Sequence, residues 1–269
     1  MGAEHGGVPL AGGMANAGAV VRHGDEVERP APPHAAALHR HLRALAAAGF
    51  GGAPEPVALD TAAGRERLAF VPGDVPLPPF PAWAMTEDAL ARVGGLLRRL
   101  HDASAALPPD PSVAWPADLA DPRGGTLLCH NDVCPENVVF RDGRPAALID
   151  FDLAAPGRPL WDLAMAARYW APVLDPESAE AAGRGGLDPV RRLRVLADGY
   201  GLAREGREEL VEAVGEAIAV GRAFVAGRVA GGDPVYRASF AAYGGWRRWE
   251  RIGEWYARTR GTFVRALLA

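Results

Sequence analysis

The N-terminal part of the chain alternates between short apolar runs and polar turns. Residues 17–29 place apolar residues on both sides of a His-Gly-Asp turn, which predicts a β-hairpin. Residues 33–50 carry leucines at helical spacing and stop at a glycine, which predicts a helix. Residues 54–60 and 65–73 have the pattern of two further strands. The pattern therefore predicts a small sheet with one helix.

A proline-rich segment separates this part from the rest of the chain. Residues 71–81 hold too many prolines to continue a helix or a central strand, so we expect them to connect two domains, residues 1–73 and 74–269. Residues 86–107 then show apolar side chains on one face, with Thr86 placed as the N-cap of a helix.

The larger predicted domain begins with strands and ends with helices. Three short apolar strands are expected at residues 126–129, 137–140 and 145–149, the last two joined by an Asp-Gly turn. From Trp161 onward the pattern is almost wholly helical, without a coiled-coil heptad or any other pattern that predicts an oligomeric state. Together the two parts predict an α+β protein.

Polar side chains gather in the loop between the first of these strands and the hairpin. The loop contains His130, Asp132 and Asn137, and the hairpin ends at Asp150. Because the hairpin returns the chain to its start, we expect the two carboxylates and the amide oxygen to meet. Hard oxygen donors of this kind suit Mg²⁺ and suit Zn²⁺ poorly. Asp132 is then available to accept the proton of a hydroxyl that attacks a phosphoryl group.

Composition and charge exclude several other functions. The net charge is −4, which argues against a nucleic-acid partner. No apolar run is long enough for a membrane span or a signal peptide, and the only cysteines, Cys129 and Cys134, do not form a disulfide framework, so we expect a cytoplasmic protein. All 29 basic residues are arginines, so any fixed cation must be an arginine.

The motif H-x-D-x-x-x-x-N followed by I-D-F-D resembles the aminoglycoside phosphotransferase and choline kinase family. It is carried by "HNDVCPEN" and "LIDFD", and further similarity is seen in "LAGGMAN", "LAFVPG" and "PLWDLA". The whole pattern is especially similar to a group of actinobacterial members labelled trifolitoxin-immunity-like.

The resemblance implies a bilobed protein-kinase-like fold, with a small antiparallel-sheet lobe and a mostly helical lobe. It also implies a Mg²⁺-dependent transfer of the γ-phosphoryl group of ATP or GTP to a hydroxyl of a small-molecule acceptor, such as an antibiotic or another secondary metabolite. The implied roles are a catalytic base and its supporting histidine, Asp132 and His130; metal ligands, Asn137, Asp150 and Asp152, the last either touching the metal or supporting a ligand; nucleotide-binding residues, Arg29, Gly12, Gly13, Asn16, Phe70 and Val71; and a structural residue, Asp162.

The sequence departs from the family pattern at one place. Such kinases carry a lysine on the third strand, paired with a glutamate from the next helix. Here the strand position is Arg29, and the helix offers His39 and no glutamate. An arginine can bind phosphate without a carboxylate partner.

Two rival hypotheses follow from this departure and from the motifs. A non-catalytic protein of the same fold, which binds a nucleotide or sequesters a toxin as an immunity protein, is consistent with the missing lysine and glutamate. A protein kinase is less consistent, because no activation segment is recognisable. From Asp233 onward three acidic residues stand against seven arginines, which disfavours a strongly cationic acceptor at the C-terminal helices.

Overall fold

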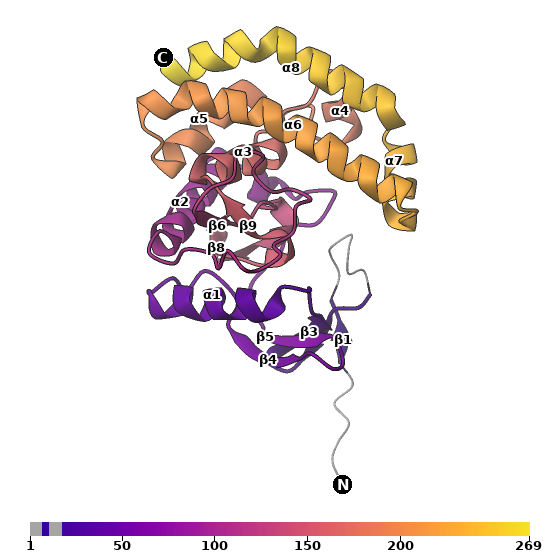
Figure 1. Cartoon of the computed structure of the whole chain (residues 1–269). Helices are drawn as coiled ribbons and strands as arrows, with labels where there is room; N and C mark the ends of the chain where they lie inside the picture. Colours follow the sequence, from indigo (N-terminus) through magenta and orange to yellow (C-terminus); the bar gives the residue numbers. More distant parts are fainter. Residues whose placement is uncertain (1–6, 11–17) are drawn as a thin grey trace.

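The structure, a computed structural model, describes residues 7–10 and 18–269. Figure 1 shows two lobes, with a sheet and helix α1 at the N-terminal end and a helical lobe that extends to the C-terminus. The elements of the small lobe are β1 (Val8–Pro9), β2 (Val21–His23), β3 (Glu26–Pro30), α1 (Ala35–Ala47), β4 (Pro56–Asp60) and β5 (Arg65–Ala69).

The small sheet is antiparallel, with strand order β1-β2-β3-β5-β4. The turn between β2 and β3 contains Gly24 in the left-handed region, which confirms the predicted hairpin. The register between β3 and β5 sets Arg29 directly opposite Glu66. Since residues opposite each other on adjacent strands share one face of a sheet, these two side chains lie side by side. In Figure 1, α1 lies between this sheet and the helical lobe.

The chain crosses between the lobes just after β5. The backbone of Asp74 exchanges two hydrogen bonds of 2.8 Å with Phe140 of the larger lobe. Gly73 lies so close to this contact that a side-chain carbon at its position would be 2.3 Å from the carbonyl oxygen of Phe140. We propose that the domain boundary lies at this crossing, near residue 73, as the proline-rich sequence predicts.

The larger lobe combines two short two-stranded sheets with a stack of helices. Its strands are β6 (Leu127–Cys129), β7 (Val138–Arg141), β8 (Arg144–Leu148) and β9 (Ala155–Gly157). Its α-helices are α2 (Glu87–Ser104), α3 (Pro159–Trp170), α4 (Pro176–Ala181), α5 (Pro189–Tyr200), α6 (Arg207–Ala230), α7 (Pro234–Ala242) and α8 (Gly245–Leu268). Short 3₁₀ turns are η1 (Ala82–Met85), η2 (Pro135–Asn137), η3 (Phe151–Leu153) and η4 (Arg204–Gly206).

Local sequence signals explain where several of these elements begin and end. Thr86 caps α2, because its Oγ1 accepts a hydrogen bond of 3.1 Å from the backbone N–H of Ala89. The turn between β7 and β8 places Asp142 and Gly143 in the left-handed region, as a tight hairpin requires. Strand β9 has no counterpart in the sequence analysis, since three residues containing Pro156 show no detectable period. It pairs with β6.

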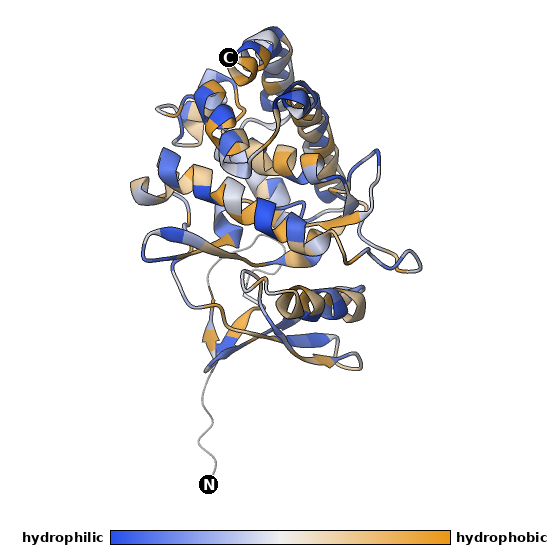
Figure 2. Cartoon of the chain, turned by 90° about the vertical axis from the view of Figure 1, so that its left-hand side faces the viewer, coloured by the Kyte–Doolittle hydropathy of each residue, from blue (hydrophilic) through white to orange (hydrophobic). Residues whose placement is uncertain are grey.

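The main hydrophobic core lies in the helical lobe and reaches under the polar loop. Trp161 and Trp170 are fully buried, and their indole N–H groups donate to the carbonyl oxygens of Leu119 and Val133. Trp170 therefore fixes the loop that contains Val133 as well as packing in the core. Figure 2 shows hydrophobic and hydrophilic residues alternating along the helices of this lobe, as expected for amphipathic helices around a core.

The predicted α+β class with two lobes is confirmed. Within the described residues, none of the helices combines the length and the apolar character that a membrane crossing requires.

Candidate active site

The polar loop follows strand β6 and is held by a buried carboxylate. Asp162, in the first turn of α3, is fully buried and accepts hydrogen bonds from the backbone N–H groups of His130 (2.8 Å) and Asn131 (2.7 Å). Its Oδ2 also lies 3.0 Å from Nε2 of His101. Burial alone acts to raise the pKa of Asp162, but the hydrogen bonds from His101 and from the backbone of His130 outweigh it and lower the pKa. These contacts agree with the structural role expected for Asp162.

His130 is fully buried and uses both ring nitrogens within the loop. Nε2 lies 3.0 Å from the carbonyl oxygen of Ile149, to which it donates, and Nδ1 accepts from the backbone N–H of Asp132 at 3.3 Å. Its ring also packs against Phe151, with centroids 4.4 Å apart. His130 therefore supports the loop and leaves no ring nitrogen for proton transfer.

Asp132 is the carboxylate at the centre of the loop. Its Oδ1 accepts from the hydroxyl of Tyr169 at 3.1 Å, and its Oδ2 accepts from Nδ2 of Asn137 at 3.0 Å. Burial raises the pKa of Asp132 to about 6, and the negative charge of Asp150 adds to this, while His130 opposes it. A carboxylate with this pKa is ionised at neutral pH and is a stronger base than an exposed aspartate.

The sequence analysis missed Tyr169. It lies on α3, seven residues and two helical turns after Asp162, so the two side chains face the same loop. That spacing after the aspartate of "PLWDLA" is the signal that could have identified it.

The hairpin β7–β8 brings Asn137 and Asp150 together, as the sequence predicts. The backbone N–H of Ile149 donates to the carbonyl oxygen of Asn137 at 2.9 Å. Asp150 then adopts a left-handed conformation, with φ 64° and ψ 66°, which a non-glycine residue rarely takes. This conformation ends the strand and turns the chain into η3, so that Asp150 and Asp152 lie near each other.

The oxygen donors of Asn137 and Asp150 fit a magnesium ion. The amide nitrogen of Asn137 donates to the backbone carbonyl and the carboxylate of Asp132, so its amide oxygen is free to bind a cation. Oδ2 of Asp150 makes no hydrogen bond within the described residues, and the side chain is 31% exposed. Two carboxylates and an amide oxygen are a typical Mg²⁺ donor set. In the part of the chain that the structure describes, no three His, Cys, Asp or Glu side chains form a metal cluster.

Arg29 connects the small lobe to this donor set. Its Nε donates to Glu66 (2.8 Å), its Nη1 to Asp150 (2.8 Å) and its Nη2 to Asp152 (2.6 Å). The second oxygen of Glu66 lies 2.7 Å from Nε2 of His39 on α1. Burial opposes the charge of Arg29, but the three carboxylates outweigh it and raise its pKa above the ordinary value. We call Arg29, Glu66, His39, Asp150 and Asp152 the Arg29 cluster.

The structure completes the departure noted in the sequence. Helix α1 supplies no glutamate, as the sequence shows, yet Arg29 does have a buried carboxylate partner, Glu66 on the neighbouring strand. Sequence reasoning missed Glu66 because the expected partner lies on a helix. The signal was an acidic residue among the inward positions of β5, where its neighbours of the same face are apolar.

The remaining predicted nucleotide-binding residues lie at the edge of the small lobe. Phe70 and Val71 follow β5 directly, in the segment that crosses to the larger lobe. The guanidinium of Arg22 covers the ring of Phe70, 3.6 Å from its centroid. Gly12, Gly13 and Asn16 lie outside the described residues.

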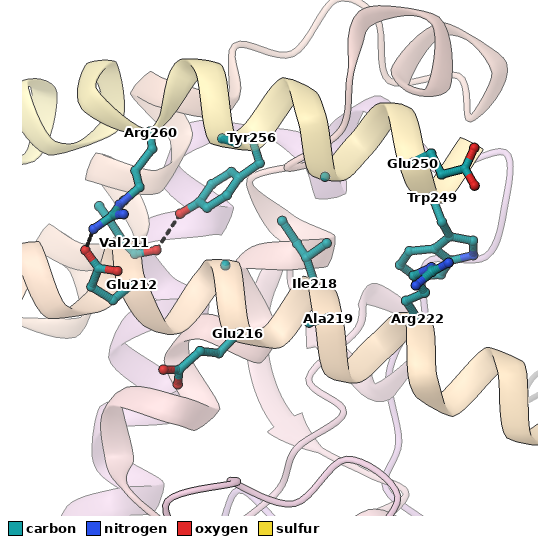
Figure 3. A pocket seen from close by; sticks show the side chains of 13 residues that line it. Val211, Glu212, Glu216, Ile218, Ala219, Arg222, Trp249, Glu250, Tyr256 and Arg260 are labelled. Carbon is teal, nitrogen blue, oxygen red and sulfur yellow. Dashed lines mark hydrogen bonds and ion pairs between the residues drawn. The ribbon is translucent and has the colours of Figure 1, made fainter. Parts of the chain in front are cut away.

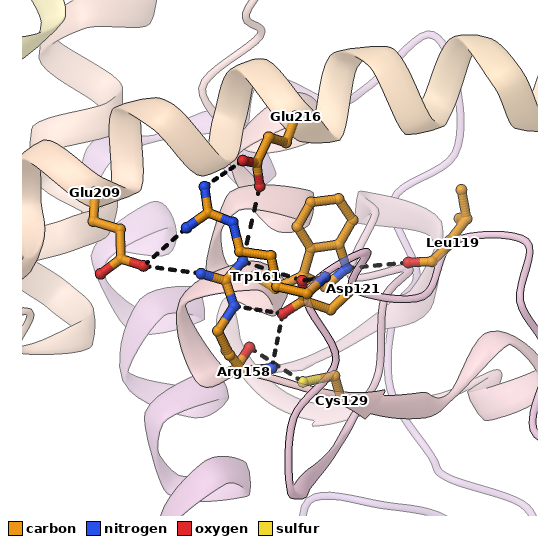
Figure 4. Close-up of polar contacts among 8 residues, drawn as sticks. Leu119, Asp121, Cys129, Arg158, Trp161, Glu209 and Glu216 are labelled. Carbon is orange, nitrogen blue, oxygen red and sulfur yellow. Dashed lines mark hydrogen bonds and ion pairs between the residues drawn. The ribbon is translucent and has the colours of Figure 1, made fainter.

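A second arginine cluster joins the start of α3 to α6 (Figure 4). Arg158 binds Asp121 through Nε (2.7 Å), Nη2 (3.1 Å) and its backbone N–H (3.1 Å), and reaches Glu209 on α6 at 2.9 Å. Arg123 and Glu216 complete this group, which we call the Arg158 cluster. It holds β9 and the start of α3 against α6. The buried thiol of Cys129 donates to the carbonyl of Arg158, so Cys129 is part of this packing.

A groove of about 650 Å³ lies between α6 and α8, away from the polar loop (Figure 3). Its walls include Ile218 and Trp249, and Tyr256 closes one side by donating its hydroxyl to the carbonyl oxygen of Val211. None of the predicted site residues that the structure describes lines this groove.

Comparisons with known proteins agree with the motifs. Residues 112–200, which contain the polar loop and the hairpin, match the phosphotransferase enzyme family (APH). The chain is 36% identical to the trifolitoxin immunity protein of Rhizobium leguminosarum bv. trifolii over 199 residues, which are 72% of this chain and 74% of that protein. A shorter match, 34% over 104 residues, covers 39% of this chain and 30% of the homoserine kinase of Gluconacetobacter diazotrophicus.

Solved structures share the fold at low sequence identity. A choline/ethanolamine kinase family protein from Mesorhizobium loti superposes with a TM-score of 0.63 and 19% identity, covering 99% of this chain and 94% of that one. The gentamicin complex of the phosphotransferase APH(2″)-IIa gives a TM-score of 0.53 and 14% identity, with coverage of 98% and 93%. From the fold, the motif and the related sequence together, the chain belongs to the phosphotransferase enzyme family of the aminoglycoside phosphotransferases and choline kinases, as a relative of the trifolitoxin immunity protein.

Proposed function

We propose that this protein is a Mg²⁺-dependent small-molecule kinase, which transfers the γ-phosphoryl group of ATP or GTP to a hydroxyl of its acceptor. Asp132 accepts the proton of the acceptor hydroxyl as its oxygen bonds to the γ-phosphorus, and the bond from that phosphorus to the nucleoside diphosphate breaks. Since the nucleotide is abundant in the cytoplasm, we place the reaction there.

The other site residues take supporting roles in this proposal. Asn137, Asp150 and Asp152 are the candidates to hold Mg²⁺, which when bound would neutralise charge on the nucleotide phosphates. His130 keeps the loop in shape, and Arg29 binds phosphate. Phe70 and Val71 supply backbone groups that bind the purine ring of the nucleotide. Gly12, Gly13 and Asn16 cover its phosphates.

The observation that carries the proposal is the environment of Asp132. Its two oxygens are each fixed by one hydrogen bond, from Tyr169 and from Asn137, so the carboxylate cannot rotate. Its pKa of about 6 leaves it ionised near neutral pH yet able to take a proton. The contacts of the buried Asp162, by contrast, lower its pKa.

The direct test is turnover with a panel of hydroxyl acceptors. Purified protein with Mg-ATP or Mg-GTP is incubated with homoserine, choline, gentamicin, a macrolide and a set of hydroxy acids, and phosphorylated product is detected by mass spectrometry. We expect product with at least one class of acceptor, and a loss of about 10³-fold or more in kcat for Asp132→Asn. Asp142→Asn, in the exposed turn of the same hairpin, is the matched control and is expected to keep full activity.

A negative result for the wild-type protein and both variants would contradict the enzyme proposal. The proposal fails if the wild-type protein binds no nucleotide and makes no product, and if Asp132→Asn and Asp142→Asn behave alike.

The charges near Asp132 favour an acceptor that is anionic or neutral. Arg168 lies over the ring of Tyr169 at 5.3 Å, and Arg184 donates to the carbonyl of Tyr169 and lies over Phe80 at 4.5 Å. Neither arginine has an ion-pair partner among the described residues. A polycation such as an aminoglycoside meets repulsion here, whereas a carboxylate or phosphate on the acceptor meets attraction. We therefore expect hydroxy acids to exceed gentamicin in kcat/KM.

The rival function is sequestration without catalysis. The similarity to a trifolitoxin immunity protein is consistent with it, and so are the bonds from Arg29 to Asp150 and Asp152, the two carboxylates proposed to hold Mg²⁺. Isothermal titration calorimetry separates the two: tight binding of a peptide or antibiotic without any need for Mg-nucleotide favours sequestration, and nucleotide-dependent binding favours the kinase.

A further inference from the structure

The partner of Arg29 has moved from a helix to a strand. Glu66 stands directly opposite Arg29 in the antiparallel pair β3–β5, and its side chain is completely buried. One oxygen of Glu66 accepts from Nε of Arg29, and the other is bonded to His39. The helix position where the family resemblance leads one to expect a glutamate is thus occupied by a histidine that acts through Glu66.

Burial makes this chain of contacts rigid. The side chains of Arg29, Glu66 and His39 are 7%, 0% and 3% exposed. Water therefore does not compete for these hydrogen bonds, and the loss of one partner leaves a buried charge without compensation. By contrast, Arg67 and Glu26 in the same sheet form an ion pair of 2.6 Å that is 47% and 34% exposed. Such exposed pairs contribute little.

The geometry also fixes which part of Arg29 faces the site. Glu66 takes the Nε edge of the guanidinium, so the two Nη groups point to Asp150 and Asp152 on the other lobe. A lysine at position 29 would end in a compact ammonium group. It would lack the planar guanidinium that contacts all three carboxylates here. Only an arginine held along its Nε edge presents two parallel donors across the junction between the lobes.

The contacts of Arg29 also bear on phosphate binding. Within the described residues, Arg29 contacts three carboxylates, those of Glu66, Asp150 and Asp152. A divalent cation held by Asp150 and Asp152 would offset part of their charge, and the two Nη donors of Arg29 would then be available to an anionic oxygen of a nucleotide phosphate.

We infer that His39 and Glu66 are positioning residues that hold Arg29 by its Nε edge, so that its two Nη groups form the phosphate-binding donor of the small lobe. We call the three residues Arg29 (β3), Glu66 (β5) and His39 (α1) the relay. The relay provides the fixed cation that, in the family this chain resembles, is provided by a lysine and a helix glutamate. The inference rests on the proposed function, because it assigns a role in nucleotide binding.

A double-mutant cycle on nucleotide affinity tests the relay. The dissociation constant of a fluorescent ATP analogue is measured with Mg²⁺ for the wild-type protein, Glu66→Gln, Arg29→Met and the double variant. We expect Glu66→Gln to weaken binding by about tenfold, since it replaces a charged hydrogen-bond acceptor by a neutral one. In the Arg29→Met background the same change is expected to have no effect, because there is no guanidinium left to position.

Two sets of variants control this cycle. Glu26→Gln changes the exposed pair of the same sheet and is expected to leave the dissociation constant unchanged. His39→Leu removes the contact to Glu66 and is expected to weaken binding by about threefold, whereas His39→Gln retains a donor and restores it. Thermal unfolding of each variant confirms that binding is measured on folded protein.

The outcomes separate the relay from the function on which it rests. Equal effects of Glu66→Gln in the two backgrounds, or no effect in either, overturn the relay while nucleotide binding by the wild-type protein keeps the kinase proposal. No nucleotide binding by the wild-type protein overturns the proposed function and the relay's role with it.

Discussion

The two arginine clusters each contain one fully buried carboxylate, and they differ in where their partly exposed carboxylates lie. Arg158 binds the fully buried Asp121 with three of its nitrogens, and its two other carboxylates, Glu209 and Glu216 on α6, are 50% and 32% exposed. Arg29 binds three carboxylates, of which only Glu66 is fully buried. The partly exposed ones are the two that a metal and a nucleotide would approach.

Three buried carboxylates, Asp121, Asp162 and Asp132, differ in the direction in which their pKa values are shifted. Burial acts to raise the pKa of Asp121, but hydrogen bonds from Arg158 and from the backbone outweigh it, and the pKa is lowered. Asp162 behaves in the same way, whereas Asp132 has its pKa raised to about 6. Asp121 and Asp162 are buried carboxylates whose contacts offset their burial, and they hold the fold, whereas the contacts of Asp132 do not offset its burial, which fits its proposed role as the base.

The strongest way to break the comparison is to remove the arginine at the junction of the lobes. Arg29→Met deletes the cation that faces the site, and we expect kcat/KM for phosphoryl transfer to fall by about 10²–10³-fold. Arg29→Lys keeps a positive charge without the paired donors, so its kcat/KM is expected to lie between those of Arg29→Met and the wild type. Steady-state kinetics measures both; an Arg29→Met enzyme with wild-type kcat/KM contradicts the assignment.

Removing the other arginine is expected to affect stability instead. Arg158→Met leaves Asp121 buried without its partner, so the free energy of unfolding should fall by about 3 kcal/mol. In the folded protein the nucleotide dissociation constant should stay unchanged, because Arg158 contacts no residue of the Arg29 cluster. Urea denaturation and nucleotide titration measure the two effects. A change in nucleotide affinity without a change in stability contradicts the division into a structural and a functional cluster.

A change of pH separates the two kinds of carboxylate. Asp132 must be ionised to accept a proton, so below its pKa of about 6 the rate should fall by about tenfold for each pH unit. Because the pKa of Asp132 is higher in the folded than in the unfolded protein, its protonation favours the folded state. Asp132 therefore adds stability as the pH falls from about 6 toward the pKa of an aspartate in the unfolded protein.

The same experiment tests the structural carboxylates. Asp121 and Asp162 have lowered pKa values, so their contribution to stability is present above the unfolded pKa of an aspartate and is lost only at lower pH. Between pH 7 and 5 we therefore expect kcat/KM to fall while the thermal midpoint holds. Parallel losses of both, or a flat rate profile, would show that Asp132 is not the titrating base.

The smallest expected effect lies at the exposed end of the Arg158 cluster. Glu209→Gln removes an ion pair whose carboxylate is half exposed, so the free energy of unfolding should change by about 0.5 kcal/mol or less. Comparison of its denaturation curve with that of Asp121→Asn measures how much of the cluster's stability comes from the buried pair. A loss from Glu209→Gln as large as that from Asp121→Asn contradicts this ranking.

Much of the fold could be read from short segments. The hairpin turn at Asp142 and Gly143, the cap at Thr86 and the helical periodicity of α2 are each determined within a few residues, and the structure confirms them. The motif from His130 to Asn137 is also local, because one tight loop sets its spacing. The bilobed fold class followed from these segments together with the family resemblance.

What the sequence by itself determined about this protein is therefore the local elements and the set of polar residues that its loop brings together. Only the tertiary structure decided which distant side chains share a contact: Glu66 beside Arg29, His39 behind Glu66, and Tyr169 on Asp132. The physical reason is range. Turns, caps and periodicity depend on neighbours in the chain, whereas these pairs depend on strand register and on the docking of α1 and α3, which no local pattern specifies.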